Sequence, residues 1–237
     1  MTTERLLRIE ACPTTTGSAV LVAIEPRCAD ESTGDGSTTD LAQLPAHERH
    51  RAATMPAHRR GEFVRGRSLL RRLVAAEFDV APPEVPVAVS PSGSLHLDGW
   101  PGSWLAGISL SHCPHWTVAA VYRGGEVGVD VEDPPDVLDD RLVQRCLAAE
   151  APAVLAMPLP ARAAAFVRVW AVQEACVKAT GEGIAGAPWR IPVGPEDRCG
   201  RWRDVRWQAL PLVEPAALAI ATRPWSATAG PTEPRKP

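Results

Sequence analysis

The sequence predicts an α+β protein of two similar halves, each with a helix packed on a small antiparallel sheet. Two stretches, at about 45–78 and 139–180, have helical periodicity, and each is followed by short runs typical of strands joined by tight turns. The chain has 237 residues, enough for one large domain or two small ones. We expect the halves at residues 1–115 and 116–225, followed by a disordered tail at 226–237.

The N-terminal half is expected to contain one long helix between strands. Its elements, in order, are a strand at 17–25, a polar loop at 30–40, the helix at about 45–78, a hairpin at 85–97 and a strand at 108–112. Apolar residues between Phe63 and Val74 repeat at the spacing of helical turns, with arginines around them. Pro82 and Pro83 follow the helix and end it, because proline cannot continue a helix.

The C-terminal half is expected to begin with strands and to continue with helices. Its elements, in order, are strands at 116–123 and 126–132, helical stretches at 139–157 and about 161–180, and two short strands within 201–221. Gly124 and Gly125 form the turn between the first two strands. Gly181 ends the longer helix, since glycine readily adopts the left-handed conformation found there.

Composition excludes several function classes. With 25 basic and 28 acidic residues the formal net charge is -3, which favours neither nucleic acid nor an anionic membrane as a partner. Arginines nevertheless cluster between His47 and Arg72, where their field would attract an anion; the alternative is a solvated helix face. The cysteines form no C-x-x-C pair and no run is long enough to span a membrane, so we expect a protein of the reducing cytoplasm.

The segment GVDVE at 128–132 places two carboxylates on one side of a strand. Residues two apart in a strand point the same way, so Asp130 and Glu132 project together while Val129 and Val131 face the other side. Neighbouring carboxylates repel unless a cation lies between them, and Mg²⁺ accepts a few carboxylates together with water or phosphate oxygens. The alternative is an edge strand with solvated acids.

The segment WAVQEACVK at 170–178 places Trp170, Glu174 and Lys178 on one helical face. Glu174 could serve as a metal ligand or base, and Lys178 as a contact to phosphate. The alternative is a surface ion pair between these two residues, worth only ~0.3–0.5 kcal/mol. Lys178 is notable because arginine replaces lysine almost everywhere else, Lys236 being the one other lysine of the chain.

The segment LSHC at 110–113 ends a strand with two polar side chains. Ser111 could donate a hydrogen bond to a phosphate, and His112 could do so more strongly when protonated. The alternative is a structural histidine. A serine hydrolase is excluded by the absence of G-x-S-x-G, and neither a P-loop, a G-x-G-x-x-G fingerprint nor a zinc signature occurs.

Taken in order, these segments resemble the Sfp-type family of 4′-phosphopantetheinyl transferases. That family has Ser-His before a hydrophobic strand, then (V/I)-G-(V/I)-D-(V/I)-E, and further along W-x-x-K-E-A-x-x-K-x-x-G-x-G. This chain reads ISLSHC, VGVDVE and WAVQEACVKATGEG, and its GRSLLRRLVAAE resembles the G-R-x-x-x-R helix of the family. The four motifs span about residues 45–185, and their shared order makes the resemblance specific.

The resemblance implies two pseudo-symmetric halves with coenzyme A bound between them. The implied reaction transfers the 4′-phosphopantetheine arm of coenzyme A to a serine of an acyl or peptidyl carrier protein and releases 3′,5′-ADP. Asp130, Glu132 and Glu174 are implied to hold Mg²⁺, with Glu174 also deprotonating the acceptor serine. Lys178 is implied to lie at the phosphates and to neutralise the leaving group.

Four further residues match the family as contacts to coenzyme A. Ser111 and His112 are implied to contact its phosphate end, and Arg67 and Arg71 to contribute from the basic helix. The carrier protein is the expected macromolecular partner, with no nucleic acid and no membrane. We expect a monomer, because a chain of two halves can complete the site alone.

The chain departs from the family at two positions. Gln173 stands where lysine usually precedes the glutamate, and Ser94 stands at the lysine of a common G-K-P segment. Two cations of the phosphate region are therefore missing, which predicts weaker binding of coenzyme A. The alternative function is a catalytically impaired homologue that binds coenzyme A or a carrier protein without turnover.

Overall fold

The computed structural model describes residues 5–10, 19–27, 38–100, 105–212 and 215–225. In these ranges the chain forms two four-stranded antiparallel sheets, one two-stranded hairpin and helices that cover the sheets, which confirms the predicted α+β class. No helix in these ranges is long and apolar enough to cross a membrane. The expected tail, and the expected loop as far as residue 37, lie outside the described residues.

The first sheet has the strand order β1-β2-β6-β5, with every neighbouring pair antiparallel. Its strands are β1 (Arg5–Glu10), β2 (Ala19–Pro26), β5 (Gly107–His112) and β6 (Trp116–Tyr122). The helices of this half are α1 (Thr38–Ala42), α2 (Ala46–Ala53) and α3 (Ala57–Phe78). A 3-10 turn, η2 (Pro82–Glu84), leads to the hairpin of β3 (Val87–Val89) and β4 (Leu95–Leu97).

The second sheet has the strand order β7-β10-β9-β8 and is also antiparallel. Its strands are β7 (Gly125–Glu132), β8 (Cys199–Trp202), β9 (Val205–Leu210) and β10 (Ala217–Pro224). The helices of this half are α4 (Asp140–Leu147), α5 (Ala151–Leu155) and α6 (Leu159–Thr180). The 3-10 turns are η4 (Ala148–Glu150), η5 (Gly183–Gly186) and η6 (Pro188–Arg190).

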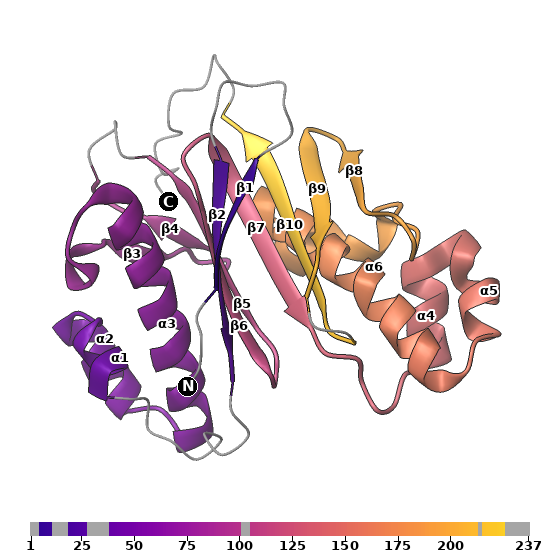
Figure 1. Ribbon diagram of the computed structural model, residues 1–237, viewed down its shortest axis with the longest axis horizontal. Helices are drawn as coiled ribbons and strands as arrows, with labels where there is room; N and C mark the ends of the chain where they lie inside the picture. The colour runs from indigo at the N-terminus through magenta and orange to yellow at the C-terminus, as the bar shows by residue number, and fades with distance from the viewer. Residues whose placement is uncertain (1–4, 11–18, 28–37, 101–104, 213–214, 226–237) are drawn as a thin grey trace.

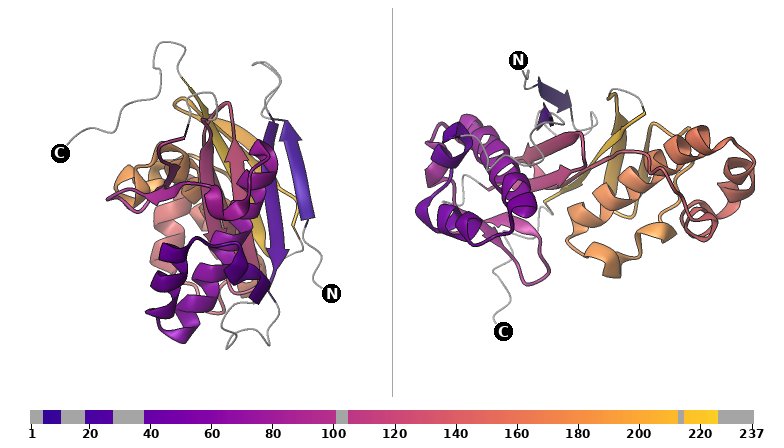
Figure 2. Two further views of the ribbon diagram at one scale, coloured as in Figure 1. Left: turned by 90° about the vertical axis from the view of Figure 1, so that its left-hand side faces the viewer. Right: turned by 90° about the horizontal axis from the view of Figure 1, so that it is seen from below.

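The layers follow the order helix, sheet, sheet, helix, with α3 on the outer side of the first sheet and α6 on the outer side of the second (Figures 1 and 2). Alternation along the strands separates the cores, because successive side chains point to opposite faces. In β6, Val118 and Ala120 belong to the core between the sheets, whereas Ala119 and Val121 pack against α3. Val127, Val129 and Val131 of β7 belong to the same central core.

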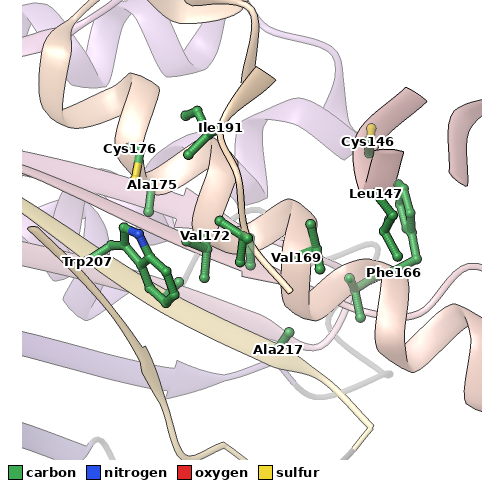
Figure 3. Packing of buried hydrophobic residues seen from close by; sticks show 14 of the residues in the cluster. Cys146, Leu147, Phe166, Val169, Val172, Ala175, Cys176, Ile191, Trp207 and Ala217 are labelled. Carbon is green, nitrogen blue, oxygen red and sulfur yellow. The ribbon is translucent and has the colours of Figure 1, made fainter. Parts of the chain in front are cut away.

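The C-terminal core lies between α6 and the outer face of the second sheet. Figure 3 shows Val172, Ala175 and Cys176 of α6 on the side of Trp207 of β9, with Val169 further along the helix, and all of these belong to one buried cluster. The helix is rich in alanine and valine and is buried on several sides, which small side chains permit. This packing fixes α6 on the sheet and thereby fixes the direction of its polar residues.

A short internal repeat supports the relation between the halves. The helices α3 and α6 both have 22 residues, and both follow a Met-Pro pair, at Pro56 and Pro158. Arg60 and Arg162 are each the fourth residue after that proline. Arg60 donates to the carbonyl oxygens of Ala52 and Met55, and Arg162 to those of Leu155 and Met157. Each arginine therefore binds one carbonyl near the end of the preceding helix and one just after it, where the regular hydrogen bonds of the helix have ended.

Several predicted boundaries are corrected. The helix expected at 45–78 is two helices, since Pro56 has no amide hydrogen to continue α2 and instead precedes the first turn of α3. The two strands expected within 201–221 are three, and β1 was not predicted. The division at residue 115 stays a prediction, although β6, which follows it, belongs to the first sheet, and the chain reaches the second sheet only at Gly125.

Candidate active site

The edges of the two sheets meet where β5 lies beside β7, near the centre of the molecule (Figure 1). The amide of Val129 donates to the hydroxyl oxygen of Ser109 at 3.0 Å, and the amide of Val131 donates to that of Ser111 at 3.4 Å. These serines give buried amides of β7 the acceptors that a neighbouring strand would otherwise supply. The bonds also hold Ser111 next to Asp130, which lies between the two valines.

Gly128 allows α6 to approach this strand closely. A Cβ atom at Gly128 would lie 1.9 Å from the carbonyl oxygen of Ala175 and 2.9 Å from Cβ of Lys178. Backbone atoms cannot yield to such a contact by changing rotamer, so a larger residue would push the helix away. The glycine of GVDVE therefore lets the side chain of Lys178 reach across to β5 and β7.

Lys178 is paired with Asp130. Its ammonium nitrogen Nζ lies 2.6 Å from Oδ1 of Asp130, 3.0 Å from Oγ of Ser111 and 3.1 Å from the carbonyl oxygen of Val129. Asp130 is 3% exposed. The ammonium ion thus binds strand residues, and the alternative of a surface ion pair with Glu174 does not describe this lysine.

The hydroxyl group of Ser111 is fully used within the protein. It donates its one proton to Oδ1 of Asp130 at 2.8 Å, and it accepts from Lys178 and from the amide of Val131. A hydroxyl has one proton and two lone pairs, so these three bonds complete its capacity. In this arrangement Ser111 orients Asp130, and a contact to phosphate would require one of the bonds to break.

Glu132 and Glu174 share the electrostatic environment of Asp130. Burial raises the pKa of Glu132 to about 7, and the charges of Asp130 and Glu174 act in the same direction, while Lys178 opposes them. Burial also raises the pKa of Glu174, and Asp130 contributes to that rise. The three acids that the sequence placed in one site therefore repel one another, and this repulsion favours protonation or a bound cation.

The donor set suits a divalent ion that also binds phosphate. Oδ2 of Asp130 and Oε1 of Glu174 are buried and have no hydrogen-bond partner among the described residues. Within that part of the chain, no group of three or more His, Cys, Asp or Glu side chains is arranged so that it could hold a metal ion by itself. Mg²⁺ is often held by one or two carboxylates, with water and substrate phosphates as its remaining ligands. The two unpartnered oxygens fit that mode, and the three-residue ligand set stays a prediction.

His112 follows Ser111 in β5 and therefore points to the opposite face. Its side chain is 47% exposed, and its Nε2 atom lies 3.5 Å from a carboxylate oxygen of Glu62. Partial burial lowers the pKa of His112, whereas Glu62 acts to raise it. A half-exposed ring is not a core residue, so the structural alternative is not supported. Its contact with a phosphate stays a prediction.

The two arginines predicted as contacts to coenzyme A lie mainly inside the N-terminal half. Arg71 has 0% exposure. It donates to Glu48 at 2.8 Å and to the carbonyl oxygens of Pro82 and Val85. A guanidinium group without exposed surface cannot reach a ligand, so the prediction for Arg71 is corrected to a structural role. Arg67 is 6% exposed beside the same Glu48 carboxylate, and its contact with coenzyme A stays a prediction.

A cleft of about 710 Å³ opens beside the C-terminal turns of α6. Glu174 and Lys178 line it, and so does Ser94, which stands where the family has lysine. His96 and Arg223 add cationic or titratable groups to the lining. These last two could not be identified from the sequence, because no motif surrounds them and only the fold brings them to the cleft.

Gln173 belongs to the core and not to the cleft. It has 0% exposure, and its amide nitrogen donates to the carbonyl oxygens of Cys146 at 2.9 Å and Ile191 at 3.0 Å. These bonds tie α6 to the end of α4 and to the residue that follows η6. The expectation that this position removes a cation from the phosphate region is therefore wrong, since its side chain points into the protein.

Two comparisons with known proteins identify the family of the chain. The sequence model of the 4′-phosphopantetheinyl transferase superfamily matches residues 126–209, which include Asp130, Glu132, Glu174 and Lys178. The 4′-phosphopantetheinyl transferase HetI of Nostoc sp. (strain PCC 7120 / SAG 25.82 / UTEX 2576) is 30% identical over 178 residues. That alignment covers 72% of this chain and 74% of HetI.

Proposed function

The chain belongs to the 4′-phosphopantetheinyl transferase superfamily and is a phosphopantetheinyl transferase; from this premise we propose that it transfers the arm of coenzyme A to a serine of an acyl or peptidyl carrier protein and releases 3′,5′-ADP. The supporting observation is the junction of β5, β7 and α6. There Asp130, Glu132 and Glu174 share one environment, and Lys178 lies at the wall of the cleft. This junction offers a place for a cation beside a space large enough for a bound ligand.

The three acids are proposed to hold Mg²⁺. The unpartnered oxygens of Asp130 and Glu174 support this, because a buried carboxylate oxygen without a partner is costly. When bound, the ion would neutralise the pyrophosphate of coenzyme A and align it for attack. Glu132, whose pKa is raised to about 7 in the ion-free protein, would then be held ionised.

The transfer step is a substitution at phosphorus. The hydroxyl oxygen of the carrier serine bonds to the β-phosphorus of coenzyme A, the bond to the bridging oxygen breaks, and its electron pair leaves with 3′,5′-ADP. Glu174 accepts the serine proton, and the burial that raises its pKa makes it a stronger base. Lys178 stabilises the charge that develops on the departing phosphate. His112 is proposed as a further phosphate contact.

The proposed partner is a carrier protein. Carrier proteins are typically acidic around the modified serine, and the exposed arginines of α2 and α3, Arg49, Arg51 and Arg59, offer a field of opposite sign. We propose a monomer in the cytoplasm, since both halves contribute to the junction within one chain and the sequence lacks paired cysteine motifs.

A mass-shift assay tests the proposal. Apo-carrier proteins are incubated with coenzyme A and Mg²⁺, and each carrier is weighed by mass spectrometry for addition of the arm. We expect Asp130→Ala to abolish the gain in mass without unfolding the protein, and Lys178→Met to slow it by at least ~10²-fold. Wild-type rates in Asp130→Ala would contradict the assignment of the site.

The alternative is a homologue that binds without turnover. The observation in its favour is Ser94, which lines the cleft at the position where the G-K-P segment of the family has lysine. The second argument for it, at Gln173, is removed by the burial of that side chain. Calorimetry that detects coenzyme A binding, with no gain in mass on any carrier of the panel, would favour this alternative.

A further inference from the structure

Lys178 has a complete set of hydrogen-bond partners before any ligand arrives. Its Nζ atom lies 2.6 Å from Oδ1 of Asp130, 3.0 Å from Oγ of Ser111 and 3.1 Å from the carbonyl oxygen of Val129. An ammonium group has three protons, so these three acceptors use all of them. A phosphate can be bound by this ammonium group only if at least one of these bonds is released.

The carboxylate oxygens of Asp130 and Glu174 differ in the number of hydrogen bonds that they accept. Oδ1 of Asp130 accepts from both Lys178 and Ser111, whereas Oδ2 of Asp130 and Oε1 of Glu174 are buried without partners among the described residues. One carboxylate oxygen is thus neutralised by a cation of the protein itself, beside two oxygens that are not. A divalent ion that approaches the open oxygens meets the positive charge of the ammonium group at short range.

Together these contacts point to competition between two cations for one carboxylate. We propose that Lys178 is an internal cation that competes with the divalent ion for Asp130, and that the pyrophosphate of coenzyme A relieves the competition by giving Lys178 another anionic partner. The inference rests on the proposed function, because it takes coenzyme A and a divalent ion as ligands of this site. The free protein then binds the ion weakly, and ion and coenzyme A strengthen each other's binding. Such coupling is reciprocal by thermodynamic linkage.

The direction in which one variant changes the affinity for Mn²⁺ tests the inference. Mn²⁺ is titrated into the protein without coenzyme A, and free Mn²⁺ is followed by electron paramagnetic resonance. We expect Lys178→Met to bind Mn²⁺ at least about tenfold more tightly than wild type, within the range of typical couplings between sites. A residue that only supports the site would give weaker binding on removal, so unchanged or weaker Mn²⁺ binding by Lys178→Met overturns the inference.

Two further variants separate the possible causes. Arg223→Met also removes a positive charge from the lining of the cleft, but Arg223 forms its ion pair with Asp204, at 2.6 Å, whereas Lys178 pairs with Asp130. We expect its Mn²⁺ affinity to stay near wild type, and equal tightening in both variants would show a general charge effect and overturn the inference. Asp130→Asn should lose Mn²⁺ binding. If it does not, the proposed ion site itself is wrong, which is a different result from a failure of the competition.

A measurement on the wild-type chain does not depend on the folding of any variant. Lys178 and Lys236 are the two lysines of the sequence, so lysine labelled with ¹³C and ¹⁵N at the side-chain end gives only two sets of signals. Addition of Mg²⁺, which is diamagnetic, should move the Lys178 signals and leave those of Lys236 in place. Coenzyme A added after Mg²⁺ should move the Lys178 signals again. Lys178 signals that stay fixed while the ion saturates the site overturn the inference.

Discussion

Gly128 and Ala175 fix how closely α6 approaches β7, since a Cβ atom at Gly128 would lie 1.9 Å from the carbonyl oxygen of Ala175. The backbone of β7 fixes the position of that Cβ atom, and the carbonyl oxygen belongs to the backbone of α6, so neither can move away by changing a rotamer. The close approach is what allows Lys178, three residues after Ala175, to bind Asp130 on the strand. The geometry of the site therefore depends on a residue with no side chain.

Gly128→Ala is expected to push α6 away from the strand. We expect the free energy of unfolding in urea to fall by about 1–3 kcal/mol, the usual cost of overpacking a core. Transfer activity should fall further than stability does, because Lys178 and Glu174 move with the helix. The two quantities are measured by urea denaturation and by the mass-shift assay.

Gly66→Ala provides the matched control. Its Cβ atom would meet a methyl group of Leu110 at 2.9 Å, and that side chain can adjust. Gly66 lies inside α3, where alanine is favoured over glycine by about 1 kcal/mol. We expect Gly66→Ala to be close to neutral and fully active. Equal losses in the two variants would show that the close contact at Gly128 has no special importance.

Gln173→Lys tests whether this position belongs to the cleft. The side chain of Gln173 is bonded to the carbonyl oxygens of Cys146 and Ile191 inside the core. We therefore expect the KM for coenzyme A to stay unchanged in Gln173→Lys. Gln173→Leu should lower the free energy of unfolding by about 1–3 kcal/mol, because it leaves buried carbonyl groups without donors. A lower KM in Gln173→Lys would instead place this residue near the phosphates.

The placement of the acidic residues could be predicted because it follows from local periodicity. Asp130 and Glu132 share a face since strand residues alternate, and Glu174 and Lys178 share one since they are four apart in a helix. The pairing of Lys178 with Asp130 could not be predicted in this way. It depends on how closely α6 packs on β7, and this close packing is possible because Gly128 has no Cβ atom to clash with the helix.

The burial of polar side chains was the other property that the sequence did not reveal. Arg71 lies in a run of arginines that reads as a basic surface, yet its partners are Glu48 and two carbonyl groups from the chain that follows α3. Arg60 and Arg162 mark a repeat of Met-Pro-x-x-x-Arg that is visible in the sequence. Apart from the arginine, the two segments share only a methionine and a proline. That is too little to identify a repeat until the structure shows that each segment joins a short helix to a long one.

The pH dependence of stability should report on Glu132. In the ion-free folded protein the pKa of Glu132 is raised to about 7, whereas in the unfolded chain it returns to about 4.3. The folded state therefore holds this proton more tightly, which stabilises it below the unfolded pKa, and the stabilisation is lost as pH rises through about 7. With EDTA present, we expect the melting temperature of wild type to fall more steeply than that of Glu132→Gln between about pH 5 and pH 8.

Mg²⁺ should reverse this loss. A carboxylate must be deprotonated to bind the ion, so the rise in melting temperature on addition of Mg²⁺ should be larger at about pH 8 than at about pH 5. Glu132→Gln should show a smaller difference between the two conditions. Parallel pH profiles for wild type and variant in EDTA would contradict the raised pKa of Glu132.

The hydroxyl group of Ser111 could orient Asp130 or contact a phosphate, and variants of Ser111 distinguish these two roles. Loss of each role alters a different kinetic constant. Its hydroxyl group donates to Asp130 and accepts from Lys178, so it acts on the site through those two residues. We expect Ser111→Ala to reduce kcat by about 10–100-fold, as is typical when a residue supporting a metal ligand is removed, with little change in the KM for coenzyme A. Ser111→Thr keeps the hydroxyl group and should retain most of the activity. A raised KM with unchanged kcat in Ser111→Ala would instead assign the hydroxyl group to the phosphates, and would mean that its bonds to Asp130 and Lys178 break when coenzyme A binds.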